Sequence, residues 1–477
     1  MPSRTHVRLI FAFLFTLSTM VLATGFVASV TGSNNVRAGM EDGPHGIQHI
    51  PPNELTVATD HKSPSVGAKL VAFDSEGTVR YYNDTLDYYS DVDPSPTGKY
   101  TVTYVGTEDL RPKQCDGASA CRRMVIERLN LSTDHTTRLY SRIVPTYKGY
   151  TLPYTNRWHD VDRINRTHFA VADIERDRVF VVNTSSGIVT WEWLALSHYS
   201  HKSGGPYPYD FTHVNDVEVL EDGRIMASIR NQDQVVFLNR TTGVVENWTI
   251  GEEGNHKWLF GQHNPDYIPE SQGGPAVIIA DSHNDRIVEY QRVNGSWEQS
   301  WVWRDNRLQW PRDADRLPNG NTLITDTHGN RVVEVDENGE PVWSVELHFP
   351  YDAERLGTGD ESAGGESAQR ADIAGREPIS GANDDANSQE NEGTRTKTQN
   401  GVSLLGLAGQ AMDAIEEAIP EMVLNAVLYA LPGWADVDDV FALAVLLGTT
   451  GAWGSMEAYW RGYRIRKPFS RIETDQQ

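Results

Sequence analysis

The sequence predicts an all-β fold assembled from a repeated unit, with an apolar helix at each end of the chain. Four segments of the 477-residue chain open alike, as HDVDRI, HVNDVEVL, HNPDYI and RDADRL, and they begin at His159, His213, His263 and Arg312. The period is therefore about fifty residues, a length found in repeat architectures. Each opening is followed by a turn, an alternating strand, a polar turn, a third strand and a Trp-bearing fourth strand such as GIVTWEW. Four short antiparallel strands in every period are typical of one blade of a β-propeller.

Weaker copies of the same unit lie upstream. The segments YTVTYVG and RMVIERLNL supply one more blade, and LVAFDSEGTVRYYN supplies most of another. Six periods therefore fit between residues 54 and 349. We predict a six-bladed β-propeller over residues 54–350, with N-terminal and C-terminal membrane-associated helices.

The N-terminal segment, residues 1–32, reads as a membrane anchor. Its run from residue 9 to residue 30 carries no charge, and Arg4 and Arg8 precede it. That length spans the hydrocarbon core of a bilayer. A cleaved signal peptide has a shorter apolar region, so an uncleaved signal anchor is favoured.

The C-terminal third of the chain changes character twice before a second apolar stretch. Residues 354–400 are rich in Gly, Ser, Asp, Glu and Asn, which predicts a flexible acidic linker. Residues 401–433 are apolar with carboxylates at helical spacing, which indicates amphipathic helices on a membrane surface or a self-associating helical module. Residues 437–460 then predict a transmembrane helix, and residues 461–477 form a basic tail. Because basic residues mark the cytoplasmic side, we expect a cell-membrane protein with both termini cytoplasmic and the propeller extracellular.

Charge excludes one class of function. The chain has 66 acidic and 42 basic residues, and its formal net charge is −24. A nucleic-acid binder needs a basic face to displace counterions from phosphate, so nucleic acid is not an expected partner. The acid excess and scarce lysine also suit a halophilic, strongly hydrated surface screened by molar salt. A homodimer is a further expectation, with no residue pattern assigned to it.

The two cysteines, Cys115 and Cys121, stand in CDGASAC between a turn and a strand-like run. They could close a small disulfide loop or contribute to a metal site, but no histidine lies near them in the sequence. The disulfide is favoured because the rest of the sequence indicates an extracellular location, where disulfides persist.

The propeller topology predicts where the polar residues of the repeat meet. Within one blade, the first strand begins at the same face of the propeller at which the second strand ends. The start of the first strand and the end of the second therefore lie side by side. The expected neighbours are His213 with Arg230, His159 with Asp173, His263 with His283, and Arg312 with the turn at 326–328. Six-fold closure then brings three histidines and two arginines to one axial pocket, an anion-binding site able to exchange protons.

Other repeat residues have competing interpretations. His283 and His328 occupy similar turns, DSHNDR and DTHGNR, and are equally suited to turn structure or to substrate binding. Tyr209 and Phe211 in GGPYPYDF could contact an aromatic ligand or pack within their loop. An aspartate recurs in all four openings, which favours an architectural role as an acceptor of backbone hydrogen bonds; these residues are Asp162, Asp216, Asp266 and Asp315.

The sequence motifs of several other kinds of site are absent. The chain has no GxxxxGK[ST] phosphate loop and no GxGxxG after a strand, so a nucleotide-bound donor is not expected. It has no GxSxG nucleophile elbow. A metal at the histidines is disfavoured because the neighbouring arginines repel a cation. We therefore expect neither a metal nor a cofactor.

At these residues the sequence resembles the arylsulfate sulfotransferases, six-bladed propellers that work without a nucleotide sulfate donor. The resemblance rests on HVNDVEVLEDGRIMASIRNQDQVVFL and FGQHNPDYIP, and it covers roughly residues 150–350. It implies that His263 is the nucleophile that takes a sulfuryl group from a phenolic ester and passes it to a phenol. It further implies assisting roles for His213, Arg230 and His159. The axial geometry, and not the resemblance, places Arg312 among the substrate-binding residues. The chain departs from the family in its short blades, in the arginine at the Arg312 opening and in its membrane segments.

Two functions from different classes follow. The first is an outward-facing sulfotransferase with a sulfohistidine intermediate, which a neutral imidazole can form. The second is a non-catalytic, membrane-tethered propeller that binds an anionic ligand or a surface partner.

Overall fold

The structure is a computed structural model that describes residues 3–41, 55–61, 67–145, 157–376, 425, 427, 428, 431 and 437–461. The chain forms two compact units, one made of the terminal segments and one containing the sheets. The amphipathic region at 401–433, the basic tail beyond 461 and the acidic linker beyond 376 lie almost entirely outside the described residues.

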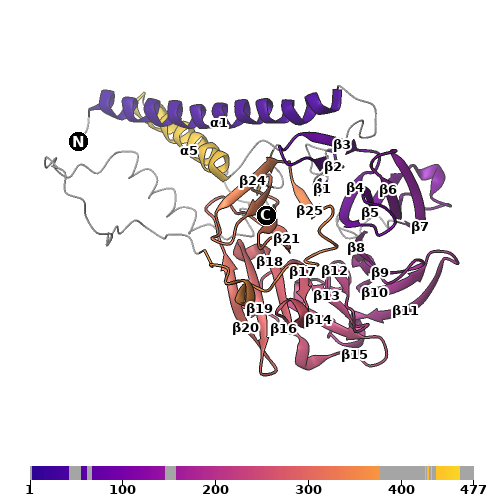
Figure 1. The fold of residues 1–477 in the computed structure, drawn as a ribbon. Coiled ribbons are helices and arrows are strands. Elements are labelled where there is room, and N and C mark those ends of the chain that lie inside the picture. The colour runs from indigo at the N-terminus through magenta and orange to yellow at the C-terminus, as the bar shows by residue number, and fades with distance from the viewer. Residues whose placement is uncertain are drawn as a thin grey trace, which may run out of the picture. The chain divides into compact units, whose positions relative to one another are not determined.

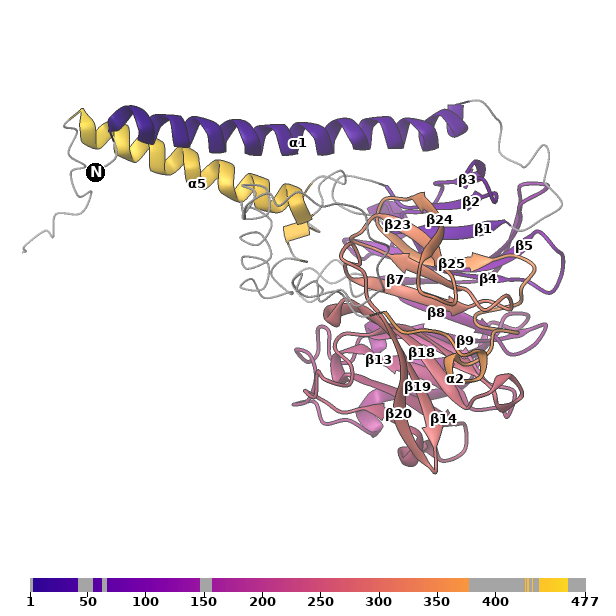
Figure 2. The same cartoon turned by 60° about the vertical axis from the view of Figure 1, so that its left-hand side comes forward.

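The terminal unit contains residues 4–31 of helix α1 (Arg4–Glu41) and all of helix α5 (Val437–Trp460). These two long apolar helices lie side by side in both views (Figures 1 and 2). Each is long and apolar enough to cross a membrane, over 4–24 and 439–460. Arg8 forms a two-bond ion pair with Glu457, at 2.5 and 2.9 Å. The Phe11 ring stacks on Trp453 at 6.1 Å between centroids. This order of contacts makes the helices antiparallel, so the start of α1 and the end of α5 lie at the same end of the pair.

The second unit confirms the prediction of a six-bladed β-propeller (Figure 1). Blades A, B and C are three antiparallel sheets, with strands β25 (Pro350–Arg355), β1 (Thr56–Asp60), β2 (Lys69–Phe73) and β3 (Val79–Asn83) in A; β4 (Tyr88–Pro94), β5 (Thr101–Leu110), β6 (Cys121–Asn130) and β7 (His135–Pro145) in B; and β8 (Trp158–Arg163), β9 (His168–Asp173), β10 (Arg178–Asn183) and β11 (Ile188–Leu194) in C. Blade A joins the two ends of the propeller, because β25 pairs with β1 across almost three hundred residues of sequence (Figure 2). That pairing closes the ring.

Blades D, E and F repeat the order. Their strands are β12 (Val214–Val219), β13 (Ile225–Ile229), β14 (Gln234–Asn239), β15 (Gly243–Val244) and β16 (Ile250–Gly251) in D; β17 (His263–Ile268), β18 (Ala276–Asp281), β19 (Arg286–Val293) and β20 (Ser296–Trp303) in E; and β21 (Pro311–Arg316), β22 (Thr322–Asp326), β23 (Arg331–Val335) and β24 (Pro341–Glu346) in F. Short helical turns join several strands: η1 (Pro112–Gln114), η2 (Ile174–Arg176), η3 (Ala195–Ser197), η4 (Arg230–Gln232), η5 (Glu246–Trp248), η6 (Glu270–Gln272), η7 (Ser282–Asn284) and α2 (Ala368–Ala371). Aliphatic side chains alternate along the inner strands, and they pack between neighbouring blades as one buried cluster per interface.

The first strand of each blade is interrupted by a β-bulge near its start. The cross-strand register skips one residue in blades A, B, C, D and F: Tyr351, Ser90, His159, Asn215 and Arg312. In blade E the irregularity directly follows His263, which pairs with Ala280 before the register resumes at Asp266. A bulge re-aims a side chain without ending the strand, so blades A, B, C, D and F each have one residue near the strand start that is free of the cross-strand ladder.

Carboxylates then join the blades to one another. Asp160 and Asp162 of blade C accept hydrogen bonds from the backbone N–H groups of Val217 and Val219 in blade D. Equivalent bonds run from Val161 N–H to Asp91, from Val92 N–H to Asp352, from Ala353 N–H to Asp313 and from Tyr267 N–H to Glu218. The architectural role expected for Asp162 is therefore confirmed. These bonds satisfy buried backbone donors that would otherwise cost free energy.

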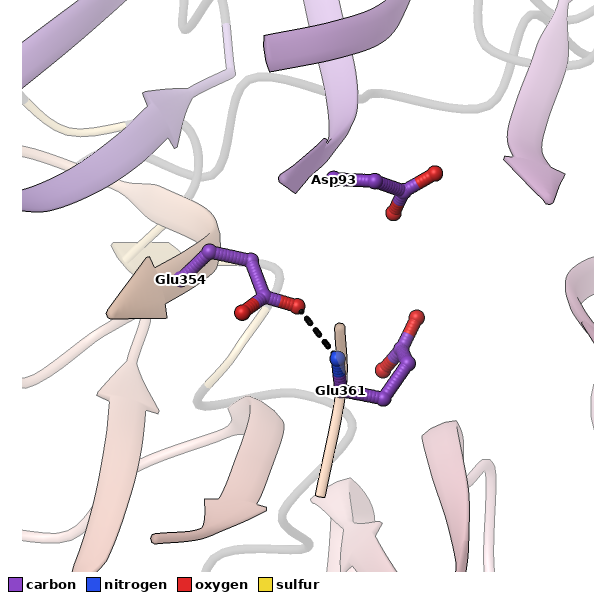
Figure 3. Close-up of side chains that lie close together, drawn as sticks. All are labelled: Asp93, Glu354 and Glu361. Carbon is purple, nitrogen blue, oxygen red and sulfur yellow. Dashed lines mark hydrogen bonds between the residues drawn. The ribbon is translucent and has the colours of Figure 1, made fainter. Parts of the chain in front are cut away.

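The segment after β25 packs on the propeller. The Ser362 hydroxyl donates to Asp266 at 2.7 Å and accepts from the backbone N–H of Arg316 at 2.8 Å, which bridges blades E and F. The backbone N–H of Glu361 donates to Glu354 at 2.9 Å, and the Glu361 side chain lies beside Asp93 (Figure 3). Ala368 and Ile373 join the buried cluster between blades E and F.

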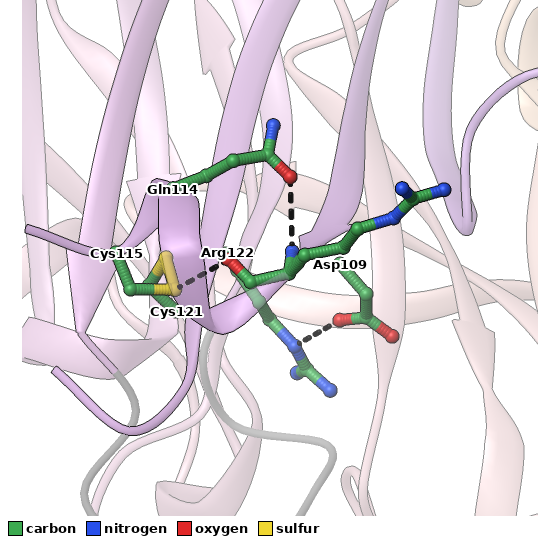
Figure 4. The surroundings of a disulfide bond; sticks show 6 residues. Asp109, Gln114, Cys115, Cys121 and Arg122 are labelled. Carbon is green, nitrogen blue, oxygen red and sulfur yellow. Dashed lines mark hydrogen bonds and ion pairs between the residues drawn. A yellow bond between two sulfur atoms is a disulfide. The ribbon is translucent and has the colours of Figure 1, made fainter.

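The disulfide prediction is confirmed: Cys115 and Cys121 are bonded, with a Cα–Cα distance of 5.4 Å (Figure 4). The bridge closes the loop that joins β5 to β6. Beside it, Arg122 pairs with Asp109 at 2.8 Å, and the Gln114 side chain accepts a backbone hydrogen bond (Figure 4). Both cysteines are buried beside Leu110, so this outer loop of blade B has a small core of its own.

Candidate functional site

Tyr351 is the centre of the axial site. Its hydroxyl lies 2.5 Å from Nδ1 of His159, and its ring stacks on His61 at 4.0 Å between centroids. The guanidinium carbon of Arg312 lies 4.8 Å from the Tyr351 ring, and the ring of His263 lies 6.1 Å away. The six-fold arrangement thus brings residues from blades A, C, E and F together at the axis.

The hydrogen bonds of Ser282 determine the tautomer of His263. The Ser282 hydroxyl donates to the carbonyl oxygen of Pro311 at 2.6 Å, and it lies 2.8 Å from Nδ1 of His263. A carbonyl can only accept, so the single hydroxyl proton is used there and Ser282 must accept from Nδ1–H of His263. The neutral ring then carries no proton on Nε2. His263 therefore holds a nitrogen lone pair opposite its anchored side.

Tyr351 anchors His159 through the corresponding ring nitrogen. The Tyr351 hydroxyl lies 2.5 Å from Nδ1 of His159, and either atom can donate that hydrogen bond. Nε2 of His159 is buried, and it has no hydrogen-bond partner within the described residues. Both histidines are thus anchored at Nδ1, with Nε2 on the other side of the ring.

His213 is held by a carboxylate that the sequence reading did not single out. Its Nδ1 lies 2.6 Å from Oδ1 of Asp210, and its ring lies 5.5 Å from that of His159. The loop carrying Asp210 is tied to blade D, because Asn231 donates to the Asp210 carbonyl at 2.6 Å. The nearby His213 and Arg230 hold the pKa of Asp210 below its usual range, although burial alone would raise it. Asp210 thus stays ionised beside His213.

Arg230 lies at the start of the turn η4 and contacts His283 of the next blade. Its Nη2 donates to Nε2 of His283 at 3.4 Å, and its Nη1 donates to Asn231 at 3.3 Å. The close approach requires Gly261, whose φ is +60° and whose missing Cβ would lie 2.1 Å from His283 Cδ2. The glycine of the FGQH segment therefore makes room for the His283 ring.

Ion pairs explain why the turn in blade D differs from those in its neighbours. In blades C, E and F the last residue of the second strand is an aspartate paired with the arginine five residues later: Asp173 with Arg178, Asp281 with Arg286 and Asp326 with Arg331, at 2.8, 2.7 and 2.8 Å. Blade D has Ile229 and Gln234 at these two positions. Blade D therefore lacks this ion pair, and its turn begins with Arg230, which lies beside His283.

Burial and positive charge keep the imidazoles neutral. Burial, with the charges of Arg312 and Arg230, lowers the pKa of His263 well below its ordinary value. Burial and Arg157 do the same for the pKa of His159. Burial lowers the pKa of His283 to about 3, with Arg230 as the next cause. The site is cationic through its arginines, and its histidines are uncharged bases.

The expected hairpin neighbours need correction at two positions. Trp158, not His159, pairs with Asp173, and Asp173 is bound by Arg178. His263 pairs with Ala280 and contacts Ser282 instead of His283. The bulges are the physical reason, since each shifts the register by one residue at the strand start. His213 and Arg230 do flank one strand pair, Val214 with Ile229, as expected.

His213 does not hold the same position in its strand as His159 and Arg312 hold in theirs. Asn215, not His213, occupies the bulge position in blade D, whereas His159 and Arg312 occupy it in blades C and F. His213 instead precedes β12 with a positive φ of 49°. It reaches the site from the strand start.

The other predicted substrate-binding residues differ in how far they are buried. His328 is buried, and its Nδ1 donates to Asn425 Oδ1 at 2.8 Å, while burial lowers its pKa to about 3. Phe211 is fully buried in the cluster between blades C and D, which favours core packing for this residue. Tyr209 is 40% exposed.

Sequence reasoning missed Tyr351, His61, Ser282 and Asp210. A signal for Tyr351 was present, because FPYDAER at 349–355 repeats the pattern of WPRDADR at 310–316. His61 and Tyr351 belong to blade A, whose strands come from both ends of the propeller. No such pattern marks Ser282 or Asp210, which act through hydrogen bonds to histidines.

Comparison with solved structures gives weak likenesses. A protein of unknown function from Bacteroides caccae aligns with a TM-score of 0.42 and 10% identity, over 64% of this chain and 100% of that chain. The periplasmic gluconolactonase PpgL of Pseudomonas aeruginosa gives 0.41 and 13%, over 64% and 99%. Virginiamycin B lyase of Staphylococcus aureus gives 0.39 and 11%, over 65% and 87%. A search of curated proteins found no match.

Fold and site define a six-bladed β-propeller with a cationic, histidine-rich axial site. The sequence profile of the Arylsulfotransferase (ASST) family matches residues 51–292, half of the chain. The chain belongs to the arylsulfotransferase family.

Proposed function

We propose that the protein is a sulfotransferase that moves a sulfuryl group from a phenolic sulfate ester to a phenol, with His263 as the nucleophile. The observation that carries this proposal is the hydrogen bond from His263 Nδ1–H to Ser282, which directs the proton-free Nε2 away from the anchored side. A neutral imidazole with an oriented lone pair is a competent nucleophile near neutral pH.

In the first step Nε2 of His263 attacks the sulfur of the aryl sulfate. The N–S bond forms, the bond from sulfur to the aryl oxygen breaks, and the electron pair leaves with the phenolate. Arg230 and Arg312 attract the sulfate oxygens. We assign the ring proton of His159 to Nε2, from which it donates to the same oxygens. In the second step the oxygen of an acceptor phenol attacks the same sulfur, its proton is lost, and His263 is released.

His213 is suited to proton transfer in both steps. Burial lowers the pKa of His213, but the ionised Asp210 at 2.6 Å stabilises its protonated form. A bound sulfate adds negative charge beside the ring and favours protonation further. His213 then gives its proton to the departing phenolate and takes one from the acceptor.

The direct test is transfer between simple substrates. The detergent-solubilised full chain, mixed with p-nitrophenyl sulfate and phenol, should release p-nitrophenol and form phenyl sulfate in equal amounts. Release without phenyl sulfate would indicate hydrolysis. Binding of the ester without release of p-nitrophenol would support the alternative, a non-catalytic propeller that binds anions.

The lowered pKa of His263 predicts an unusual pH profile. The reactive form is the neutral ring, so a pKa well below 6.5 keeps it populated in mild acid. We expect kcat/KM for the donor not to fall between pH 7.5 and 5.5, because His263 stays neutral while His213 gains protons over this range. An ordinary histidine would lose about tenfold over the same range. A tenfold fall would contradict the electrostatics described above.

We also propose that both termini are cytoplasmic and that the propeller is extracellular. The antiparallel α1 and α5 place the start of one and the end of the other together, which suits a pair of spans with both termini on one side. Protease added to intact cells should remove the propeller and spare a short C-terminal tag. Digestion of that tag, or complete protection of the propeller, would contradict this topology.

A further inference from the structure

Seven carboxylates gather where the turn after β25 meets the first strands of five blades. We call this group the axial carboxylate cluster; it consists of Asp93, Asp162, Asp266, Asp315, Glu354, Asp360 and Glu361. Carboxylate oxygens within each of three trios lie within 4.8 Å of one another: Asp93, Glu354 and Glu361; Asp93, Asp162 and Asp360; Asp266, Asp315 and Glu361. Asp93 and Glu361 each belong to two trios, and Figure 3 shows them with Glu354.

Three members of the cluster, Asp93, Asp315 and Asp360, each have an oxygen that nothing in the described chain satisfies. Asp93 and Asp315 are 5% and 1% exposed, and Oδ2 of each is buried without a hydrogen-bond partner. Buried carboxylates are ordinarily paired or bound to a metal, because leaving the charge unpaired is costly. Asp93 and Asp315 both belong to trios of the cluster, so one carboxylate oxygen of each lies within 4.8 Å of oxygens of two other carboxylates.

The surroundings of the cluster are acidic. Burial and the nearby carboxylates Asp91 and Asp360 raise the pKa of Asp93 well above its usual range. Burial, Asp313 and Glu354 do the same for the pKa of Asp315. Like charges at this separation need either a bound cation or shared protons.

We propose that the axial carboxylate cluster binds a divalent cation, Ca²⁺, through Asp93, Glu354 and Glu361. The donors are all carboxylate oxygens, which hard cations prefer, and Ca²⁺ accepts six to eight oxygens in flexible geometry. The bound ion joins β4 of blade B to β25 of blade A and to the turn that follows it. It therefore reinforces the closure of the ring.

This site is separate from the histidine site. Asp93 stands three residues beyond Ser90 on β4, and Asp315 stands three residues beyond Arg312 on β21. Three residues of extended strand span about 10 Å. The proposed cation thus lies farther along the axis, away from the arginines that would repel it.

The first measurement is metal content and thermal stability of the full chain. Protein purified without chelator should retain about one Ca²⁺ per chain by elemental analysis. After chelation, millimolar Ca²⁺ should raise the unfolding temperature by about 5 °C or more, because a ligand bound only to the folded state stabilises it. The same ionic strength of KCl should give a much smaller rise. An equal rise with KCl would overturn the proposal, since it would reflect charge screening alone.

The second measurement separates a bound cation from shared protons. The Asp93→Asn variant keeps the shape of the side chain and removes one charge. In chelator it should unfold at a higher temperature than the parent, because repulsion falls; in Ca²⁺ it should unfold at a lower one, because a ligand is lost. Glu361→Gln should behave alike, whereas Glu221→Gln in an exposed turn should not. Variants that shift the unfolding temperature equally in both buffers would overturn the proposal in favour of proton-sharing carboxyls.

Discussion

His263→Asn is expected to abolish sulfuryl transfer while leaving the propeller folded. The asparagine amide can still donate to Ser282, which now accepts from His263 Nδ1 at 2.8 Å, but it has no basic nitrogen to attack sulfur. Loss of a covalent nucleophile should lower kcat by at least about 10⁴-fold. The initial rate with p-nitrophenyl sulfate and phenol measures this, and the parent unfolding temperature should be retained within a few degrees.

The same assignment predicts a trapped intermediate. Donor mixed with enzyme alone and quenched at alkaline pH should leave a mass increment of one sulfuryl group on the peptide containing His263. His135→Asn makes the same chemical change at an exposed position of β7 and should retain both rate and adduct. An adduct on His213 or His159, or an active His263→Asn enzyme, would refute the mechanism.

Arg230→Lys should lower kcat/KM by about 10²-fold, the loss found when one preorganised donor to a developing charge is removed. Arg230 uses Nη1 and Nη2 to reach Asn231 and His283, while its buried Nε has no partner among the described residues. Lysine keeps the charge but lacks the planar set of donors that can hold two sulfate oxygens.

The matched control for this variant is Arg240→Lys, at an exposed turn of the same blade. It should behave like the parent enzyme. If Arg230→Lys also did so, Arg230 would be a structural residue of its turn, with no role in gripping the donor.

The repeat made the fold predictable, but it did not determine register. Blades C to F share their openings closely enough to be counted from the sequence. The alignment placed His213 beside His159 and Arg312, yet Asn215 occupies the equivalent bulge. A bulge inserts one residue without changing the polar and apolar alternation that follows it, so pattern alone cannot reveal it.

Contacts across the closed ring could not be predicted from the sequence, for a different reason. Tyr351 meets His159 from a position 192 residues away, and Asn425 reaches His328 across 97 residues. Neither pair lies within one repeat, so neither follows from the hairpin geometry of a blade. Asp210 and Ser282 are similar cases, because only a hydrogen bond to a histidine shows that each belongs to the site.

The bulges make this propeller suited to directed evolution. Each bulge frees one residue from the cross-strand ladder, so its identity is uncoupled from the pairing that holds the blade together. A combinatorial library limited to the bulge residues Ser90 and Asn215, with the site residues held constant, would sample new substrate preferences while leaving every hydrophobic interface intact. Bulge residues can therefore change during evolution while the residues that pack between the blades stay the same.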